Sequence, residues 1–173
     1  VGVSVYNDAR AIERTVDKAM TSFLLRRAGV PTPPTWVVES REQARALVDR
    51  EAAAGHRVVI KPLFGSRGAG LRRLQAGSDV PDLAEYRGVA YLQRYVDSGE
   101  GHWHDYRVFV IGGAAVAAMR RWGASWVSNA ACGARCEAVT LEPALARLGC
   151  AAARAVEADY AGVDIIVDRQ GDP

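Results

Sequence analysis

The feature that most constrains this chain is an apolar run that ends in a lysine and leads directly into a glycine-rich loop. The run Val58–Ile60 is followed by Lys61, by three glycines within the next nine residues, and then by Leu71–Leu74. Because glycine adopts backbone conformations that are closed to other residues, this order predicts a strand, a flexible loop and a return strand. We call residues 63–70 the flap.

The lysine before the flap stands out because the chain scarcely uses lysine. Only Lys18 and Lys61 are lysines among 22 basic residues. An ammonium group is a compact charge with three rotatable donors, which suits contact with one phosphate oxygen in a crowded site. Glycine also lets backbone N–H groups turn toward an anion. We therefore predict that Lys61 and the flap glycines cover phosphates, and a glycine-rich hairpin tip without a ligand is the alternative. The glycines are Gly65, Gly68 and Gly70.

The composition indicates an ordinary globular protein and argues against several functional classes. With 173 residues, 49% of them hydrophobic and 24% charged, the chain can bury one core or two small lobes that share a cleft. A net charge of +2, with arginines interleaved among 20 carboxylates, argues against nucleic acid binding. The absence of a signal peptide and of an apolar stretch of roughly 20 residues argues against a membrane role. Three cysteines without Cys-x-x-Cys spacing predict free thiols and a cytoplasmic location.

Periodicity and breaker residues predict alternating helices and strands. Helices are expected over residues 17–29, 40–55 and 143–157. Strands are expected at Thr35–Val38, Val58–Lys61, Leu71–Leu74, Val89–Val96, Tyr106–Ile111, Ala114–Met119 and Tyr160–Val167. Gly112-Gly113 predicts a tight hairpin. Residues 1–16 look like a linker or the tail of a preceding domain. The segment Asp97–Gly101 is a linker signal that separates a first lobe, residues 17–97, from a second, residues 98–173.

Charged residues within the predicted strands are candidates for chemistry. Asp164 lies in an otherwise apolar strand, and a carboxylate there needs a partner. Mg²⁺ together with nucleotide phosphates would supply one, and an ion pair with an arginine is an equal alternative. Asp105 and Arg107 are separated by one residue, so they point to the same face of a strand and can contact one bound molecule.

These motifs, in this order, resemble the ATP-grasp superfamily and, within it, the RimK-type α-L-glutamate ligases. The likeness spans about residues 17–172. It rests on Asp17-Lys18, residues 28–33, Lys61–Gly70, Leu92–Val96, Asp105–Arg107, Ser128-Asn129 and Ala161–Asp164. The resemblance implies an α+β fold in which two lobes grip a nucleotide. It also implies that a carboxylate is joined to an amine through an acyl phosphate, with ATP and Mg²⁺ or Mn²⁺ as cofactors.

The resemblance assigns roles to residues by position. Lys18 and Lys61 would contact the nucleotide phosphates, and Asp164 would be the first metal-binding carboxylate. Arg107 and Arg121 would act on the substrate carboxylate or the acyl phosphate. The other positions that match nucleotide-binding residues are Gly65, Ser66, Gly68, Gly70, Gln93, Arg94, Tyr95, Asp105 and Asn129.

Departures from the family pattern bear on function. Arg94 and Tyr95 form the hinge that would meet adenine through backbone groups, yet the family often has an acidic residue at position 94. It also often has a basic residue where this chain has Val127. The family's second metal motif, Glu-x-Asn, lies beyond the last residue, and an N-terminal substrate-binding domain is missing. We therefore expect a fragment of a longer protein that by itself binds ATP weakly and turns nothing over.

The resemblance implies an ATP-dependent carbon–nitrogen ligase that adds L-glutamate to a small-molecule or protein carboxylate acceptor. It is compatible with a homo-oligomer. A non-catalytic ATP-binding module with the same fold is the alternative, and an arginine-rich RNA-binding domain ranks last. The sequence leaves open the identity of the acceptor and the amine, and whether one or several residues are added.

Overall fold

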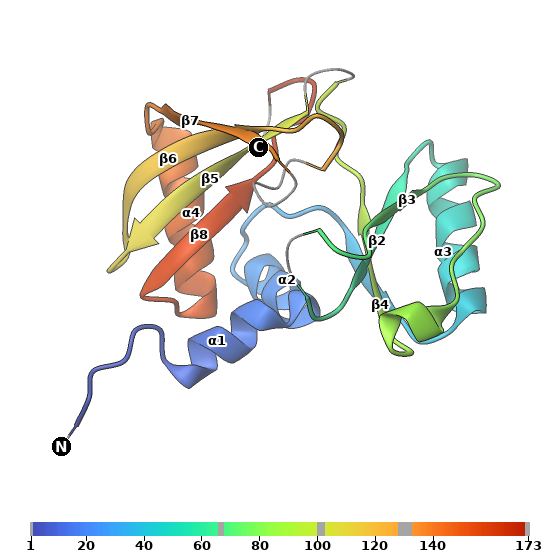
Figure 1. The fold of residues 1–173 in the computed structure, drawn as a ribbon, viewed down its shortest axis with the longest axis horizontal. Coiled ribbons are helices and arrows are strands. Elements are labelled where there is room, and N and C mark those ends of the chain that lie inside the picture. The colour runs from blue at the N-terminus through green and yellow to red at the C-terminus, as the bar shows by residue number, and fades with distance from the viewer. Residues whose placement is uncertain (1, 66–67, 100–102, 128–132, 172–173) are drawn as a thin grey trace.

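The computed structural model describes residues 2–65, 68–99, 103–127 and 133–171, which form two antiparallel sheets with helices packed against them (Figure 1). In these segments the first sheet has the strand order β1-β4-β2-β3 and the second the order β7-β6-β5-β8. The predicted α+β class is confirmed. None of the helices in the described segments combines the length and the apolar character that crossing a bilayer requires.

The first sheet presents one face to a helix and the other to the centre of the molecule. Its strands are β1 (Thr35–Val38), β2 (Val58–Pro62), β3 (Arg72–Leu74) and β4 (Ala90–Arg94). Helix α3 (Arg41–Ala53) covers one face, and the short 3-10 helix η1 (Leu83–Tyr86) adds to the same core. Side chains alternate along β2, so Val58 and Ile60 are fully buried in this core and Lys61 points to the opposite face.

The second sheet is covered by helix α4 (Pro143–Val156) on one face (Figure 1). Its strands are β5 (His104–Ile111), β6 (Ala114–Trp122), β7 (Arg135–Val139) and β8 (Tyr160–Ile165). Val108 and Val110 are fully buried against α4. The helix approaches the sheet closely at Gly149, where a Cβ atom would lie 2.7 Å from Cγ1 of Val108.

Two helices near the N-terminus connect the two halves. Helix α1 (Ala9–Val16) and helix α2 (Lys18–Arg27) meet at Asp17, whose carboxylate accepts hydrogen bonds from the first turn of α2. Figure 1 shows α2 between the two sheets, and it contacts both α4 and β1. Ala11 of α1 is 1% exposed and packs against Val156 and Ala158. Helix α2 lies within the range predicted from the sequence, whereas α1 falls in residues 1–16, where no helix was predicted.

Candidate active site

A cavity of about 720 Å³ lies between the two sheets. Its walls come from β2, β4, the flap, the first turn of α2 and the end of β8. Small-molecule sites usually have volumes of roughly 300–1,000 Å³. The predicted residues that line the cavity are Lys18, Lys61, Gly65, Gly68, Gln93, Arg94, Tyr95, Asp105 and Asp164. The structure thus brings these residues to one cavity, whereas the predicted residues Gly70, Arg107 and Arg121 do not line it. Ser66 and Asn129 lie outside the described residues.

Lys61 presents its ammonium group to the cavity from β2. Its Nζ donates a hydrogen bond of 2.7 Å to Oε1 of Gln93 on the neighbouring strand β4. Burial, and then the positive charge of Lys18, lower the pKa of Lys61 to about 8, while the carboxylate of Asp164 opposes the shift. Because desolvation disfavours the charged ammonium, an anion in the cavity would both bind Lys61 and keep it protonated.

Lys18 lies in the first turn of α2, as predicted, and its side chain is hydrogen-bonded to the start of the flap. Its Nζ donates to the backbone carbonyl oxygens of Leu63, at 3.2 Å, and Gly65, at 2.9 Å. Burial lowers the pKa of Lys18, and the adjacent Asp17 acts in the opposite direction. The two lysines of the chain therefore converge on one cavity, although contact of either with a phosphate stays a prediction.

The three flap glycines all have a left-handed backbone, with φ of 138° at Gly65, 74° at Gly68 and 71° at Gly70. Gly70 is constrained further, because a Cβ atom there would lie 2.9 Å from Cγ of Pro62. Its carbonyl oxygen accepts a hydrogen bond of 3.0 Å from the Tyr86 hydroxyl. The return of the flap toward β3 therefore requires glycine at position 70.

The hinge residues Arg94 and Tyr95 are tied into the first sheet. The guanidinium of Arg94 contacts Oε2 of Glu51 on α3, with Nε at 2.9 Å and Nη2 at 2.8 Å. The positive charge of Arg94, which departs from the family pattern at this position, is therefore paired with the carboxylate of Glu51 on α3. The N–H of Arg94 donates to the Pro34 carbonyl at 2.9 Å, and that of Tyr95 to the Arg57 carbonyl at 2.8 Å. Contact between this hinge and adenine stays a prediction.

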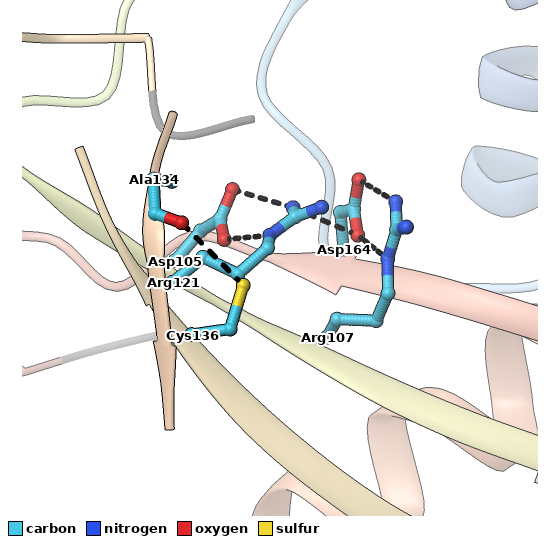
Figure 2. A network of polar contacts seen from close by, with 6 residues as sticks. All are labelled: Asp105, Arg107, Arg121, Ala134, Cys136 and Asp164. Atoms are coloured by element: carbon cyan, nitrogen blue, oxygen red, sulfur yellow. Dashed lines mark hydrogen bonds and ion pairs between the residues drawn. The ribbon is translucent and has the colours of Figure 1, made fainter. Parts of the chain in front are cut away.

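Two aspartates and two arginines of the second sheet form an alternating network of ion pairs (Figure 2). Arg121 on β6 holds Asp105 on β5 through two hydrogen bonds, of 2.6 and 2.7 Å. Its Nη2 also lies 2.9 Å from Oδ1 of Asp164 on β8. Arg107 on β5 binds Asp164 through two more hydrogen bonds, of 2.7 and 2.8 Å. Cys136 on β7 stands opposite Arg121 in the register of β6 and β7 (Figure 2). It is a free thiol, as predicted.

The sequence left two possible partners for the Asp164 carboxylate, an Mg²⁺ ion or an arginine, and the structure shows the arginine. Both oxygens of Asp164 accept hydrogen bonds from Arg107, so the ion pair considered from the sequence is present. The described segments contain no group of three His, Cys, Asp or Glu side chains that could hold a metal ion. Asp164 would offer Mg²⁺ a carboxylate oxygen only after its contacts with Arg107 and Arg121 rearranged, and phosphate oxygens and water would have to supply the other ligands. The substrate contacts assigned to Asp105, Arg107 and Arg121 stay predictions.

Sequence reasoning missed several residues that shape the cavity. Tyr91 lies on the cleft side of β4, and its hydroxyl is 2.7 Å from Oγ of Ser22 on α2. Trp126 lines the cavity and meets the ring of Tyr95 edge to face, with ring centroids 6.1 Å apart. Alternation along β4 could have indicated Tyr91, which stands two residues before Gln93. Ser22 and Trp126 belong to no pattern that would have revealed them.

The comparison with known families agrees with this architecture. A family model described as a RimK-like ATP-grasp domain matches residues 15–172. The chain belongs to this family. The resemblance inferred from the motifs is thereby confirmed.

Two relatives illustrate the family. The tetrahydromethanopterin:alpha-L-glutamate ligase of Methanosarcina acetivorans is 36% identical, and the match covers 95% of this chain and 54% of that protein. The alpha-aminoadipate–LysW ligase LysX of Saccharolobus solfataricus is 28% identical, over 98% of this chain and 62% of that protein. The ATP-grasp chain thus spans between half and two thirds of the length of these relatives.

Solved structures share the fold of this chain. The ATP-grasp ligase PsnB, complexed with a phosphomimetic variant of its minimal precursor, Mg and ADP, has a TM-score of 0.73 at 24% identity, covering 99% of this chain and 51% of its own. The D-cycloserine synthetase DcsG has a TM-score of 0.69 at 23% identity, covering 94% of this chain and 61% of its own. The predicted ATP-grasp fold is confirmed.

Proposed function

We propose that the protein containing this chain is an ATP-dependent carbon–nitrogen ligase that joins L-glutamate to a carboxylate acceptor through an acyl phosphate. Membership of the RimK-like ATP-grasp family and 36% identity to a tetrahydromethanopterin:alpha-L-glutamate ligase support the proposal. The observation that carries it is the convergence of Lys18 and Lys61, the chain's only lysines, on the cavity beside the flap.

The charges around the cavity suit a phosphorylated ligand. Two partly buried ammonium groups favour a ligand with several negative charges, such as the triphosphate of ATP. Phosphoryl transfer depends on positioning and charge neutralisation more than on a nucleophilic side chain, so Lys18, Lys61 and backbone N–H groups of the flap suffice. Closure of the flap would exclude water, which otherwise hydrolyses an acyl phosphate. Mg²⁺ or Mn²⁺ bound at Asp164 would neutralise further phosphate charge.

The substrates follow from the same reasoning. Arg107 and Arg121 do not line the cavity themselves, but both bind Asp164, which does. A substrate carboxylate held near Asp164 would lie close to the Arg107 guanidinium, whereas the Arg121 side chain is buried and would act through Asp105 and Asp164. The acceptor is a small molecule or a protein carboxylate, and the amine is that of an amino acid. The cytoplasmic location and the homo-oligomer stay predictions.

A non-catalytic nucleotide-binding module is the second candidate, and one observation favours it. Asp164 is already neutralised by Arg107 and Arg121, so in this structure its charge is not directed at a metal ion. Such a module would keep the cleft and the lysines but transfer no phosphoryl group.

One experiment separates the two candidates. The full-length protein is incubated with ATP, Mg²⁺, L-glutamate and a panel of carboxylates, and ADP release is measured. Hydroxylamine in place of the amine traps an acyl phosphate as a hydroxamate. The ligase predicts carboxylate-dependent ADP release and a hydroxamate, whereas the binding module predicts nucleotide binding without either. Failure to bind ATP contradicts both.

A further inference from the structure

The hydrogen bond that Lys61 donates is the first of a series that leads away from the cavity. The amide nitrogen of Gln93, Nε2, lies 3.3 Å from the hydroxyl of Tyr91. That hydroxyl lies 2.7 Å from Oγ of Ser22 in a buried contact. Tyr91 is 3% exposed and Ser22 8% exposed. The series therefore joins β2, β4 and α2 at the wall of the cavity.

The chemistry of the groups sets the direction of the series. A lysine ammonium only donates, so the Gln93 oxygen must face Lys61. The amide NH₂ group must then point the other way, toward Tyr91, whose oxygen accepts. The phenolic proton of Tyr91 is then available to Oγ of Ser22. Burial raises the pKa of Tyr91, so its hydroxyl keeps that proton through neutral pH.

The strand register explains why these side chains meet. Lys61 pairs directly with Tyr91 across β2 and β4, and Gln93 stands two residues further along the same face of β4. The ammonium of Lys61 lies over the Tyr91 ring, 5.9 Å from its centre, where the electrons of the ring attract the positive charge. The position of Lys61 is thus defined by one hydrogen bond and one ring.

We infer that Gln93 and Tyr91, with Ser22 behind them, are positioning residues that hold the ammonium of Lys61 so that its other two N–H donors face an anionic oxygen of a bound nucleotide. The inference deepens the proposed function and rests on its nucleotide site. A neutral amide is suited to this task, because a carboxylate at position 93 would neutralise the charge that the ligand needs.

The groups that face Lys61 come from three other elements. Lys18 on α2 repels its charge, Asp164 on β8 attracts it, and Tyr91 on β4 lies beneath it. Of these, only Tyr91 is connected to Gln93 by a hydrogen bond among the described residues. Loss of the Tyr91 hydroxyl therefore acts on Lys61 through the orientation of the Gln93 amide.

A double-mutant cycle on the full-length protein that contains this chain tests the inference. Binding of adenylyl imidodiphosphate is measured by calorimetry for Tyr91→Phe, Gln93→Met and the double variant. We expect Tyr91→Phe to weaken binding about 3- to 10-fold, as for the loss of one net hydrogen bond. We expect it to have no further effect in the Gln93→Met background, because the two residues act in series. Additive losses, or unchanged binding by Tyr91→Phe, overturn the inference.

A matched control and a second readout complete the test. Tyr106→Phe removes a hydroxyl from the second sheet on the face packed against α4, and should leave binding unchanged. Lysine labelled with ¹³C at Cε gives only two signals from this chain, and Lys18→Arg assigns them. Titration of the Lys61 signal without ligand should give a higher midpoint in Gln93→Glu and lower midpoints in Gln93→Met and Tyr91→Phe.

The titration midpoint of Lys61 and the affinity for the nucleotide test different parts of the inference. Midpoints that are equal in all variants overturn the positioning role, whether or not a nucleotide binds. If the midpoints shift but the full-length protein binds no adenylyl imidodiphosphate, the contact of Gln93 with Lys61 is supported and the nucleotide site of the proposed function is contradicted.

Discussion

The two arginines that bind Asp164 should differ sharply in their effect on stability, because they differ in burial. The side chain of Arg121 is 2% exposed and that of its partner Asp105 is 9% exposed. The side chains of Arg107 and Asp164 are 33% and 42% exposed. Removing one partner of a buried ion pair costs about 3–5 kcal/mol. An exposed pair is worth about 0–1 kcal/mol. We therefore expect Arg121→Met to lower the free energy of unfolding by about 3–5 kcal/mol, and Arg107→Met by about 1 kcal/mol or less.

Urea denaturation followed by circular dichroism measures both effects. A loss of this size is a large share of the roughly 5–15 kcal/mol that stabilises a typical domain, so the midpoint of Arg121→Met should fall clearly. The variant that combines Asp105→Leu with Arg121→Met should recover much of the loss, because apolar side chains replace the buried pair. Equal losses for the two single variants, or a double variant no more stable than Arg121→Met, refute the reasoning.

Three further predictions concern the cleft and the packing. Lys61→Ala should weaken binding of adenylyl imidodiphosphate about 10- to 100-fold in calorimetry, as for loss of a hydrogen bond to a charged group, with an unchanged circular dichroism spectrum; wild-type affinity would show that Lys61 does not bind phosphate. The pKa of Lys61 is lowered from 10.5 to about 8, so the unfolded chain binds more protons between these pH values. The unfolding free energy of the wild type should therefore rise with pH across this window relative to Lys61→Met, and a constant difference would contradict the buried ammonium. Gly149→Ala should lower the unfolding free energy by about 1–3 kcal/mol through overpacking, although alanine usually favours a helix; a raised melting temperature would argue against the close approach to Val108.

The parts of the fold that the sequence predicted are those with strong local signals. Strand β1 has the predicted bounds Thr35–Val38, and α4 begins at Pro143, as expected for proline in a first turn. Gly112 and Gly113 have φ of 55° and 81°, and they form the predicted turn between β5 and β6. In each case a few neighbouring residues determine the backbone.

Of the elements that were missed, α1 has one local signal, because Asp8 caps it by accepting a hydrogen bond from the N–H of Ala11, whereas β7 has none. Helix α1 is held by contacts of Ala11 with Val156 and Ala158, which are remote in sequence. Strand β7 (Arg135–Val139) is an edge strand with largely exposed side chains, so it shows no apolar alternation.

The same distinction applies to the site. Lysine usage and the glycine spacing pointed to Lys18, Lys61 and the flap, and the structure gathers them around one cavity. The partners of Asp105 and Asp164 could not be predicted, because the register of three strands decides which arginine each carboxylate meets.

The proposed function requires Lys18 and Lys61 to bind the phosphates of a nucleotide beside the flap. A crystal structure of the chain with adenylyl imidodiphosphate and Mg²⁺ tests it most directly. We expect phosphate oxygens within roughly 2.7–3.2 Å of the Nζ atoms of both lysines, with the adenine beside the hinge. A nucleotide bound elsewhere, or one in this cavity whose phosphates contact neither lysine, would contradict it.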